Sequence, residues 1–219
     1  MSTAKVSVYS DEDDLGYLKN MDWWYDIDFP DSYTIFDTDT LYPDRYYADG
    51  HGITSAMVEE RYHFVNEMFG DPLTSIADIG VSCGQYLKIF QDHDIEAFGV
   101  DGSKASLSKC KALGIYPNHL IQVDLRLPVD LGRKFDIIMC NDIAEHIEPP
   151  FAGMLIYNIT KHSDFILFSA ETDTLPNEPH YHHCNEMPYK YWENLFKFFD
   201  FVRVSHSHRQ DWLLFKRQS

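Results

Sequence analysis

The chain has 219 residues, 44% of them hydrophobic and 15% aromatic, which is enough for one filled core but short for two independent enzymatic domains. Thirty-five acidic residues against 18 basic ones give a formal charge of −17. This charge repels phosphate backbones and argues against nucleic acid as a partner. No apolar run approaches the roughly 18 residues needed to cross a bilayer, and residues 1–9 lack the pattern of a signal peptide. We therefore expect a soluble, cytoplasmic protein without a membrane partner, and the oligomeric state stays open.

The four cysteines, Cys83, Cys110, Cys140 and Cys184, are scattered along the chain without a C-x-x-C pair. This spacing fits neither a zinc knuckle nor a disulfide framework. We expect reduced thiols, most of which act as small packing groups.

Residues 1–70 are expected to form an extension or cap, and residues 71–219 the main domain, because the texture of the sequence changes near Asp71-Pro72. The stretch 11–47 is too aromatic for a disordered tail, and we expect it to pack on the domain as a lid. Its aromatic residues include Trp23, Trp24, Tyr25, Phe29, Tyr33, Phe36, Tyr42, Tyr46 and Tyr47. Residues 55–69 have apolar side chains close to helical spacing and are followed by Gly70, which predicts a helix.

From Ser75 onward, short apolar runs alternate with stretches of helical spacing. The runs cover residues 76–79, 97–100, 120–123, 135–140 and 165–169, and the candidate helices cover residues 85–92, 104–113, 151–160 and 188–198. Strands separated by helices of about three turns predict parallel β-α-β units in a doubly wound α/β sheet. Two further runs, 201–205 and 212–216, are joined by a link that permits a hairpin but no parallel crossover. We therefore expect a mostly parallel, seven-stranded sheet that ends with an antiparallel strand.

Open α/β sheets bind ligands where their strands end, and the first such junction carries two glycines. The segment from Asp78 to Tyr86 contains Gly80 and Gly84, and glycines let a backbone approach a ligand closely at the start of a helix. The spacing of these glycines lacks the G-x-G-x-x-G pattern of dinucleotide sites. It suits an amino-acid moiety better than a pyrophosphate. The simpler alternative is a tight turn that needs two glycines for structural reasons alone.

The later junctions add acidic side chains. Asp101 follows the second run, about twenty residues after the loop, where a carboxylate can accept both hydroxyls of a ribose. It could instead cap the next helix, but Ser103 is the better cap, which frees the aspartate. Asp124 follows the third run, where it could accept the amino group of an adenine. After the fourth run, an apolar strand leads into the polar segment 141–146.

This ordered set resembles the class I S-adenosylmethionine-dependent methyltransferases over residues 75–216. The resemblance implies an enzyme with S-adenosylmethionine as cofactor and S-adenosylhomocysteine as product. The cofactor-binding residues that it implies are Asp78, Gly80, Ser82, Gly84, Tyr86, Asp101, Gly102, Ser103, Asp124, Leu125, Asn141 and Asp142. The chain departs from the family at Tyr86, where many members carry a glycine, and at Ser82-Cys83, where others have Cys-Gly.

A hydroxyl acceptor must lose a proton, and a histidine with a pKa near neutral is the usual base for that step. His146, beside Glu145 after the fourth strand, would lie near the transferred methyl group if the resemblance holds. His182 and His183 follow the fifth strand at the same edge of the sheet. The segment from His183 to Trp192 also resembles bacterial and viral methyltransferases that modify sugars or polysaccharides. That second resemblance implies oxygen on a small-molecule or carbohydrate acceptor.

A mixed set of oxygen and nitrogen donors after the fifth strand could also hold a metal ion. Its members are Glu171, Asp173, His180, His182 and His183. Their spacing matches no metal motif, so we expect no metal.

Three other functions stay open. A nicotinamide-dependent oxidoreductase is disfavoured by the missing third glycine. Methylation of nitrogen in a base or amide is disfavoured by the segment from Asn141 to Ala144, because it lacks the Asn-Pro-Pro-Tyr or Asp-Pro-Pro-Tyr string that marks such enzymes. Nitrogen of another small molecule or of a protein terminus stays possible as the acceptor. A non-catalytic, methyltransferase-like binding subunit would keep the same cofactor residues.

Overall fold

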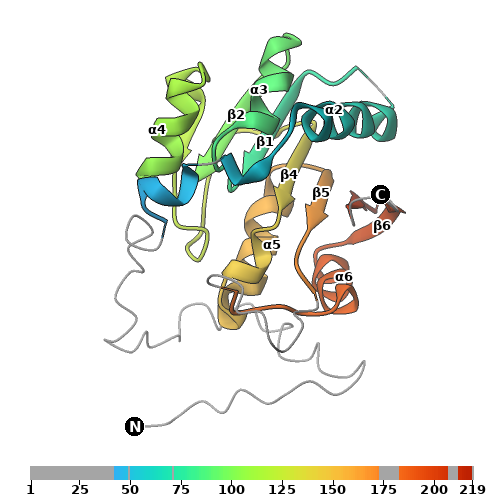
Figure 1. Cartoon of the computed structure of the whole chain (residues 1–219). Coiled ribbons are helices and arrows are strands. Elements are labelled where there is room, and N and C mark those ends of the chain that lie inside the picture. The colour runs from blue at the N-terminus through green and yellow to red at the C-terminus, as the bar shows by residue number, and fades with distance from the viewer. Residues whose placement is uncertain (1–41, 49, 71, 173–182, 207–211, 219) are drawn as a thin grey trace, which may run out of the picture. The chain divides into compact units, whose positions relative to one another are not determined.

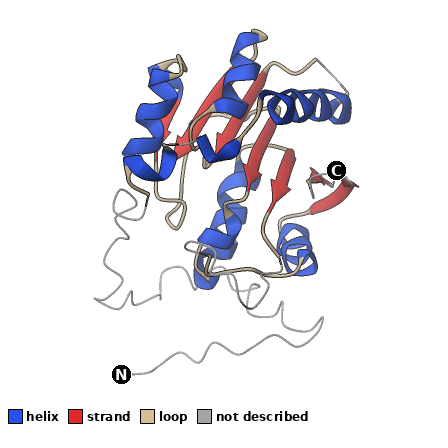
Figure 2. Ribbon diagram, viewed as in Figure 1, coloured by secondary structure: helices blue, strands red, loops and turns tan. Residues whose placement is uncertain are grey.

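The structure, a computed structural model, describes residues 42–48, 50–70, 72–172, 183–206 and 212–218. The chain divides into two compact units, Met1–Ile35 and Phe36–Ser219, and every described residue belongs to the second. A sheet with helices around it makes up the described part of this unit (Figure 1, Figure 2). The boundary predicted between residues 1–70 and 71–219 stays a prediction.

Within the described residues, seven strands form one sheet in the order β3-β2-β1-β4-β5-β7-β6. The strands are β1 (Ser75–Ile79), β2 (Glu96–Asp101), β3 (Leu120–Gln122), β4 (Ile137–Asn141), β5 (Phe165–Ser169), β6 (Phe201–His206) and β7 (Leu213–Arg217). The first five strands pair in parallel, which confirms the predicted α/β class. The strand order reverses between β1 and β4, so the switch point at which such sheets bind ligands lies at their carboxyl ends.

The predicted antiparallel strand is β7, the last strand of the chain, but it does not form the edge of the sheet. It lies between β5 and β6 and runs antiparallel to both. The outermost strand on this side is therefore β6. The short link between the two runs predicts that they pair with each other, but it does not say which of them pairs with β5.

Five α-helices in the described residues follow the predicted ones closely. They are α2 (Ser55–Phe69), α3 (Gln85–Asp92), α4 (Lys104–Ala112), α5 (Ala152–Lys161) and α6 (Tyr189–Phe198). Helix α2 begins after Thr54, whose hydroxyl accepts a hydrogen bond from the Met57 N–H at 3.3 Å. It ends at Gly70, which adopts a left-handed conformation with φ 78°. Thr54 thus begins the helix and Gly70, the signal that the sequence analysis used, ends it.

Helices cover both faces of the sheet, because alternate residues of its buried strands point in opposite directions. Leu167 belongs to the same core cluster as Phe90 of α3. Its neighbour Phe168 instead contacts Trp192 and Phe196 of α6, with ring centroids 5.5 and 5.2 Å apart. Helices α2, α3 and α4 thus lie on one side of the sheet and α5 and α6 on the other (Figure 1).

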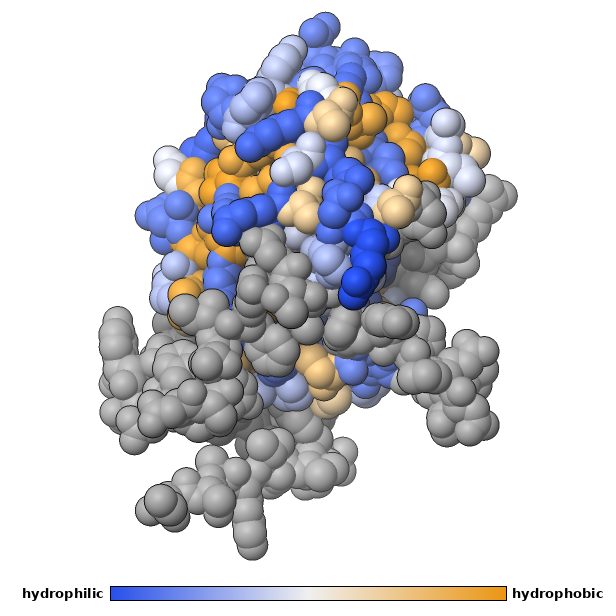
Figure 3. All heavy atoms as spheres, turned by 60° about the vertical axis from the view of Figure 1, so that its left-hand side comes forward, coloured by the Kyte–Doolittle hydropathy of each residue, from blue (hydrophilic) through white to orange (hydrophobic). Residues whose placement is uncertain are grey.

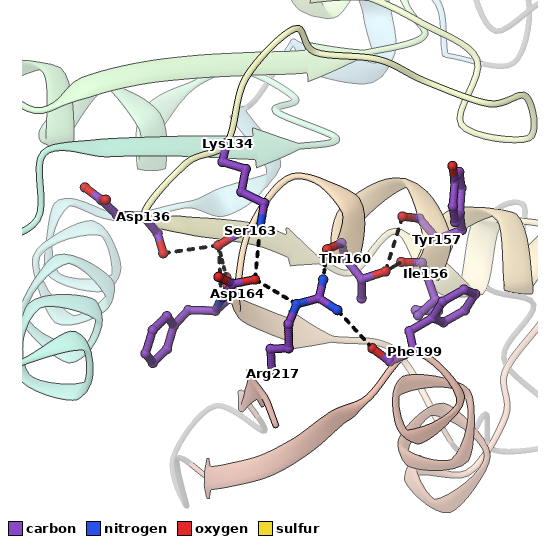
Figure 4. A network of polar contacts seen from close by, with 10 residues as sticks. Lys134, Asp136, Ile156, Tyr157, Thr160, Ser163, Asp164, Phe199 and Arg217 are labelled. Atoms are coloured by element: carbon purple, nitrogen blue, oxygen red, sulfur yellow. Dashed lines mark hydrogen bonds and ion pairs between the residues drawn. The ribbon is translucent and has the colours of Figure 1, made fainter. Parts of the chain in front are cut away.

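A polar network joins the amino ends of the parallel strands to the last strand (Figure 4). Arg217 of β7 donates to the Thr160 carbonyl at 2.6 Å, to Asp164 Oδ1 at 2.7 Å and to the Phe199 carbonyl at 3.3 Å. Lys134 Nζ donates to the same Asp164 oxygen at 3.2 Å. One side chain therefore connects β7 with the ends of α5 and α6 and with the start of β5.

The surface mixes hydrophilic and hydrophobic residues on the face drawn in Figure 3. The large hydrophobic side chains that are exposed among the described residues are Leu113, Tyr116, Leu127 and Val204. Single exposed side chains of this kind are ordinary in folded domains. No α-helix that the structure describes is long and apolar enough to cross a lipid bilayer.

Candidate active site

A cavity of about 740 Å³ lies at the carboxyl ends of β1, β2 and β4. Its walls come from the loop after β1, from residues that follow β2, β3 and β4, from helix α2 and from the segment 42–47. Ligand pockets of proteins usually have volumes of about 300–1,000 Å³. The position and size of the cavity therefore fit a site for a cofactor and a small acceptor.

The loop after β1 turns sharply because three of its residues have a positive φ. These angles are 74° at Gly80, 52° at Ser82 and 82° at Gly84. The N–H groups of Gly80 and Val81 both donate to the Val100 carbonyl, at 2.7 and 3.1 Å, which holds the loop against the end of β2. A left-handed conformation is uncommon for a residue other than glycine, so Ser82 holds local strain at the wall of the cavity.

The two glycines of this loop are also required by packing. A Cβ atom on Gly84 would lie 2.5 Å from Cδ1 of Ile115, and one on Gly80 would collide with the side chain of Ile143. The structural explanation considered for these glycines is therefore correct in part. Gly80 in addition lines the cavity, whereas Gly84 does not.

Asp101, the last residue of β2, is held by two backbone donors. Its Oδ2 accepts from the Ser82 N–H at 3.1 Å and its Oδ1 from the Ser103 N–H at 2.8 Å. Ser103 caps α4 as predicted, accepting from the Ser106 N–H, and its hydroxyl donates to the Tyr42 carbonyl at 3.1 Å. Burial raises the pKa of Asp101, although these hydrogen bonds oppose the rise. The carboxylate is therefore fixed in place and keeps acceptor capacity toward the cavity that it lines.

A buried pair of opposite charges lies beside the loop. Asp78 is 6% exposed, and burial raises its pKa to about 7, against the opposing effect of Arg61. Arg61, on α2, is 5% exposed, and its guanidinium carbon lies 3.5 Å above the ring of Tyr86 and 4.7 Å from that of Trp212. Its Nε has no hydrogen-bond partner in the described structure. A buried guanidinium with an unused donor can bind an anionic group.

Asp124, the predicted adenine-side acid, is engaged by a neighbouring arginine. Arg126 donates from NH2 to Asp124 Oδ2 at 2.8 Å and from Nε to Oδ1 at 3.0 Å. The same guanidinium reaches Glu148 Oε1 at 3.2 Å. Asp124 and Leu125 line the cavity, so the ion pair with Arg126 holds the Asp124 carboxylate in place in this wall.

The end of the aromatic N-terminal stretch closes one side of the cavity. Tyr42, Tyr46 and Tyr47 line it, with ring centroids 5.1 and 5.2 Å apart along the series. Gln85 Nε2 donates to the Gly50 carbonyl at 3.1 Å, which joins the following turn to the start of α3. The other aromatic residues of the predicted lid precede residue 42 and lie outside the described residues.

Beyond the carboxyl end of β4, the side chains of Glu145 and His146 meet that of His183. One carboxylate oxygen and one ring nitrogen from each histidine lie within 4.8 Å of one another. The two imidazole rings meet edge to face, with centroids 4.6 Å apart. His146 Nδ1 lies 3.1 Å from the hydroxyl of Tyr42, and His183 Nδ1 lies 2.6 Å from Glu186 Oε1. The sequence separates His146 and His183 by 36 intervening residues, and only the fold joins them.

Backbone hydrogen bonds explain why His183 lies beside His146. The Glu145 carbonyl accepts from the N–H groups of Cys184 and Asn185, at 2.9 and 3.0 Å. The Glu145 side chain is 1% exposed, and burial raises its pKa to about 8. Its Oε1 accepts from the Glu171 N–H at 3.2 Å, but its Oε2 has no hydrogen-bond partner in the described structure.

Asn141 and Asp142, at the end of β4, also line the cavity. Asn141 Nδ2 donates to Ser169 Oγ at 3.0 Å, and this hydroxyl donates to Asp142 Oδ1 at 2.8 Å. Asn141 Oδ1 is buried and has no hydrogen-bond partner among the described atoms. Asp142 has a φ of 55°, which directs the chain out of the strand toward His146.

Ten of the twelve predicted cofactor residues line the cavity; Gly84 and Ser103 shape its walls instead. Those that line it are Asp78, Gly80, Ser82, Tyr86, Asp101, Gly102, Asp124, Leu125, Asn141 and Asp142. The catalytic candidates His146 and His183 also line it. The third, His182, lies outside the described residues, as do Asp173 and His180.

Sequence reasoning missed Arg61. It lies on the apolar stripe of α2, four residues after Met57 and four before Val65, so an arginine occupies a position where a hydrophobic residue is expected. That exception to the pattern was the available signal. The partnership of Glu145 with His183 left no comparable signal.

No protein-family model and no curated protein matches the chain. Among solved structures, it is similar to a magnesium protoporphyrin IX methyltransferase (ChlM) from Synechocystis PCC 6803 with bound S-adenosylhomocysteine, at 17% identity and TM-score 0.61, covering 83% of this chain and 95% of that one. It is also similar to Streptomyces venezuelae DesVI, at 13% identity and TM-score 0.62 (84% and 97% covered), and to the S-adenosylmethionine-bound amino pentose methyltransferase CalS10 from Micromonospora echinaspora, at 11% identity and TM-score 0.63 (83% and 96% covered). The chain therefore has the fold of the class I S-adenosylmethionine-dependent methyltransferases.

Proposed function

We propose that the protein binds S-adenosylmethionine and transfers its methyl group to a hydroxyl of a small-molecule or carbohydrate acceptor. One observation carries the proposal. A single cavity joins the buried pair of Arg61 and Asp78, the carboxylate of Asp101 and the cluster of Glu145 with its two histidines. The first two features suit the cofactor, and the third suits the acceptor.

The residues present fit the charges of the cofactor. Its amino-acid end carries a carboxylate and an ammonium group, which would complement Arg61 and Asp78 respectively. Buried charges are costly unless each is paired and hydrogen-bonded, and the unused Arg61 Nε lacks such a partner. Asp101 would accept the ribose hydroxyls, and the wall of Asp124 and Leu125 would contact the adenine.

When bound, S-adenosylmethionine supplies a methyl group on a positively charged sulfur, which an aligned nucleophile can displace. The protein must then mainly position the acceptor and exclude water. The tyrosines of the segment 42–47 would cover the acceptor. His146 or His183 would take the proton from the acceptor hydroxyl, as the sequence analysis expected.

Two observations favour a small-molecule or carbohydrate acceptor. The polar cluster lines the same cavity as Asp101, so an acceptor at the cluster and a cofactor at Asp101 would lie in one cavity. Among the similar structures, ChlM is a porphyrin methyltransferase and CalS10 an amino pentose methyltransferase, and the segment from His183 resembles saccharide-modifying enzymes. The formal charge of −17 still argues against a nucleic-acid acceptor.

Isothermal titration with S-adenosylhomocysteine tests the cofactor site. We expect the wild-type protein to bind, and Asp101→Asn to bind about tenfold more weakly or worse, since hydrogen bonds to a charged group contribute about 1.5–3 kcal/mol. Asp92→Asn is the matched control, because Asp92 is exposed and pairs with Lys88 on α3. Absence of binding by the wild-type protein to both S-adenosylmethionine and S-adenosylhomocysteine would contradict the proposal.

Turnover is tested with a panel of hydroxylated and amino acceptors, with methylated products identified by mass spectrometry. We expect products on oxygen, and a loss of about a hundredfold or more in His146→Ala or His183→Ala, while S-adenosylhomocysteine binding is retained. His63→Ala is the control, because His63 is exposed on α2. Products on nitrogen alone would replace the hydroxyl acceptor with an amine, and absence of any product despite cofactor binding would favour a non-catalytic subunit.

A further inference from the structure

We propose that Glu145, His146 and His183 form a binding site for a divalent first-row transition-metal ion. The binding itself requires only these residues. Its role in positioning an acceptor hydroxyl rests on the proposed function. The proposal replaces the expectation that the chain uses no metal, and it involves a different set of residues from the Glu171 to His183 set considered in the sequence.

The first argument is geometric. One potential ligand atom from each of the three side chains lies within 4.8 Å of the others. Metal–nitrogen and metal–oxygen bonds of about 2.0–2.2 Å place neighbouring ligand atoms roughly 3 Å apart. Small side-chain rotations are enough to close the remaining difference. The backbone bonds from Cys184 and Asn185 to the Glu145 carbonyl already hold the two chain segments together.

The second argument is an unsatisfied buried carboxylate. Glu145 is 1% exposed, and its Oε2 has no hydrogen-bond partner in the described structure. Each buried polar group without a partner requires an explanation, and coordination of an ion is one of the few that apply. Two other carboxylates, Asp142 and Glu171, line the same cavity and add negative charge around the cluster. A cation would relieve both the desolvation of Glu145 and this repulsion.

The third argument is the orientation of the histidines. His183 Nδ1 lies 2.6 Å from Glu186 Oε1, and the tautomer that donates this hydrogen bond would place its lone pair on Nε2. His146 Nδ1 has Tyr42 as its partner at 3.1 Å. Histidines that bind metals almost always have such a partner on the second ring nitrogen, because it fixes the ring and raises its basicity.

The donor set indicates the class of metal. Imidazole suits zinc, iron, cobalt and nickel, whereas magnesium and calcium prefer oxygen ligands. Three protein ligands leave coordination positions for other groups. Because all three residues line the cavity, an acceptor hydroxyl would occupy such a position. Coordination would lower the pKa of that hydroxyl and so would replace a histidine as the means of activating it.

Titration of the metal-free full-length protein with Co²⁺ tests the site, because the visible absorption of this ion reports its ligands and Zn²⁺ can displace it. We expect one ion per chain, displaced by Zn²⁺. Glu145→Gln and His183→Ala should weaken Co²⁺ binding by more than tenfold. Glu186→Gln should weaken it by about ten- to a hundredfold, although Glu186 is not a ligand, because it orients His183. Circular dichroism checks that each variant is folded.

His63→Ala is the matched control, since His63 lies on α2 with Glu59 at 3.8 Å and is exposed. It should bind Co²⁺ like the wild type. The proposal would be overturned if Glu145→Gln and His183→Ala both bound Co²⁺ as tightly as the wild type, or if only His182→Ala lost binding. It would also be overturned if the wild type did not bind one Co²⁺ ion per chain. Titration with S-adenosylhomocysteine is run on the same samples. Binding of S-adenosylhomocysteine without binding of Co²⁺ would contradict only the metal proposal. Binding of Co²⁺ without binding of S-adenosylhomocysteine would contradict only the proposed function.

Discussion

At the scale of single residues, the site depends on charged groups that the fold removes from water. Arg61 and Asp78 are both more than nine-tenths buried. Arg61 is supported mainly by the faces of Tyr86 and Trp212. Such an arrangement costs stability in the absence of a ligand, which is typical of residues retained for binding.

Replacing Arg61 with glutamine should affect only the amino-acid end of the cofactor. Arg61→Gln should weaken the binding of S-adenosylhomocysteine by about ten- to a hundredfold, since a charge-assisted hydrogen bond contributes about 1.5–3 kcal/mol. The affinity for 5′-methylthioadenosine, which lacks the amino-acid part, should stay unchanged. Calorimetric titration with both ligands measures the difference. Equal losses for the two ligands would indicate a general structural role for Arg61 instead.

The raised pKa of Asp78 should appear as a dependence of stability on pH. The folded pKa of about 7 lies above the ordinary value near 3.8, so between these values the folded state binds the proton that the unfolded state releases. The stability that this proton provides is full below about pH 4 and is lost as the pH rises through 7. The loss amounts to at most about 4 kcal/mol, at about 1.4 kcal/mol for each pH unit.

Urea unfolding of the wild type and of Asp78→Asn between pH 5 and 8 measures this effect. The variant cannot ionise at this position. We therefore expect its stability relative to the wild type to increase as the pH rises toward 7 and to level off above it. Parallel pH profiles for the two proteins would show that Asp78 has an ordinary pKa.

At the scale of elements, the loop after β1 combines a functional surface with a packing constraint. Its backbone lines the cavity at Gly80, while the missing side chain of Gly84 makes room for Ile115. The sequence could not separate these roles, because both require glycine. The structure separates the two roles, because Gly80 lines the cavity whereas the space beside Gly84 is filled by the Ile115 side chain.

Two alanine substitutions separate backbone conformation from packing. Gly114 has a φ of 92°, and a Cβ there would meet only Lys88 Cε at 3.6 Å, so Gly114→Ala should cost about 1 kcal/mol for its left-handed backbone. Gly84→Ala has a similar φ of 82° but would also press on Ile115 at 2.5 Å. Its cost should be larger by about 1–3 kcal/mol, the usual cost of overpacking. Chemical denaturation of both variants measures the difference, and equal costs would contradict the packing role.

At the scale of the whole described unit, stability and binding occupy opposite ends of the sheet. The cavity lies at the carboxyl ends of the parallel strands, and the network around Arg217 lies at their amino ends (Figure 4). Because β7 runs antiparallel, its last residues return to the start of β5, where Lys216 pairs with Phe165. A change at one end should therefore leave the other intact.

Arg217→Ala should reduce stability without affecting the cofactor site. The side chain bonds two backbone carbonyls and Asp164, but water screens the Asp164 pair, so we expect a loss of about 1–2 kcal/mol, equivalent to about 2–8 °C in Tm. Burial tends to raise the pKa of Asp164, but Arg217 and Lys134 outweigh it and lower the pKa overall. The pair is therefore at full strength above the ordinary carboxyl pKa and is lost as the pH falls through the lowered one.

Differential scanning calorimetry with and without S-adenosylhomocysteine checks this prediction. The decrease in Tm should shrink at acidic pH, and the shift in Tm that the ligand causes should match that of the wild type. Arg203→Ala is the control, because Arg203 pairs with Glu193 on the surface and bonds no carbonyl in the described structure. An unchanged Tm in Arg217→Ala would show that the network does not stabilise the unit.

The sequence by itself determined the α/β class, the strands and helices of the described part and the order of the acids that follow the strands. These depend on hydrophobic periodicity and on local signals such as Gly70, which act within a few residues. Only the tertiary structure decided that β7 lies between β5 and β6, that Arg61 lines the cavity and that Glu145 and His146 meet His183. Each of these depends on contacts between segments far apart in the chain, whose pairing is selected by packing of the whole sheet and leaves little trace in local sequence.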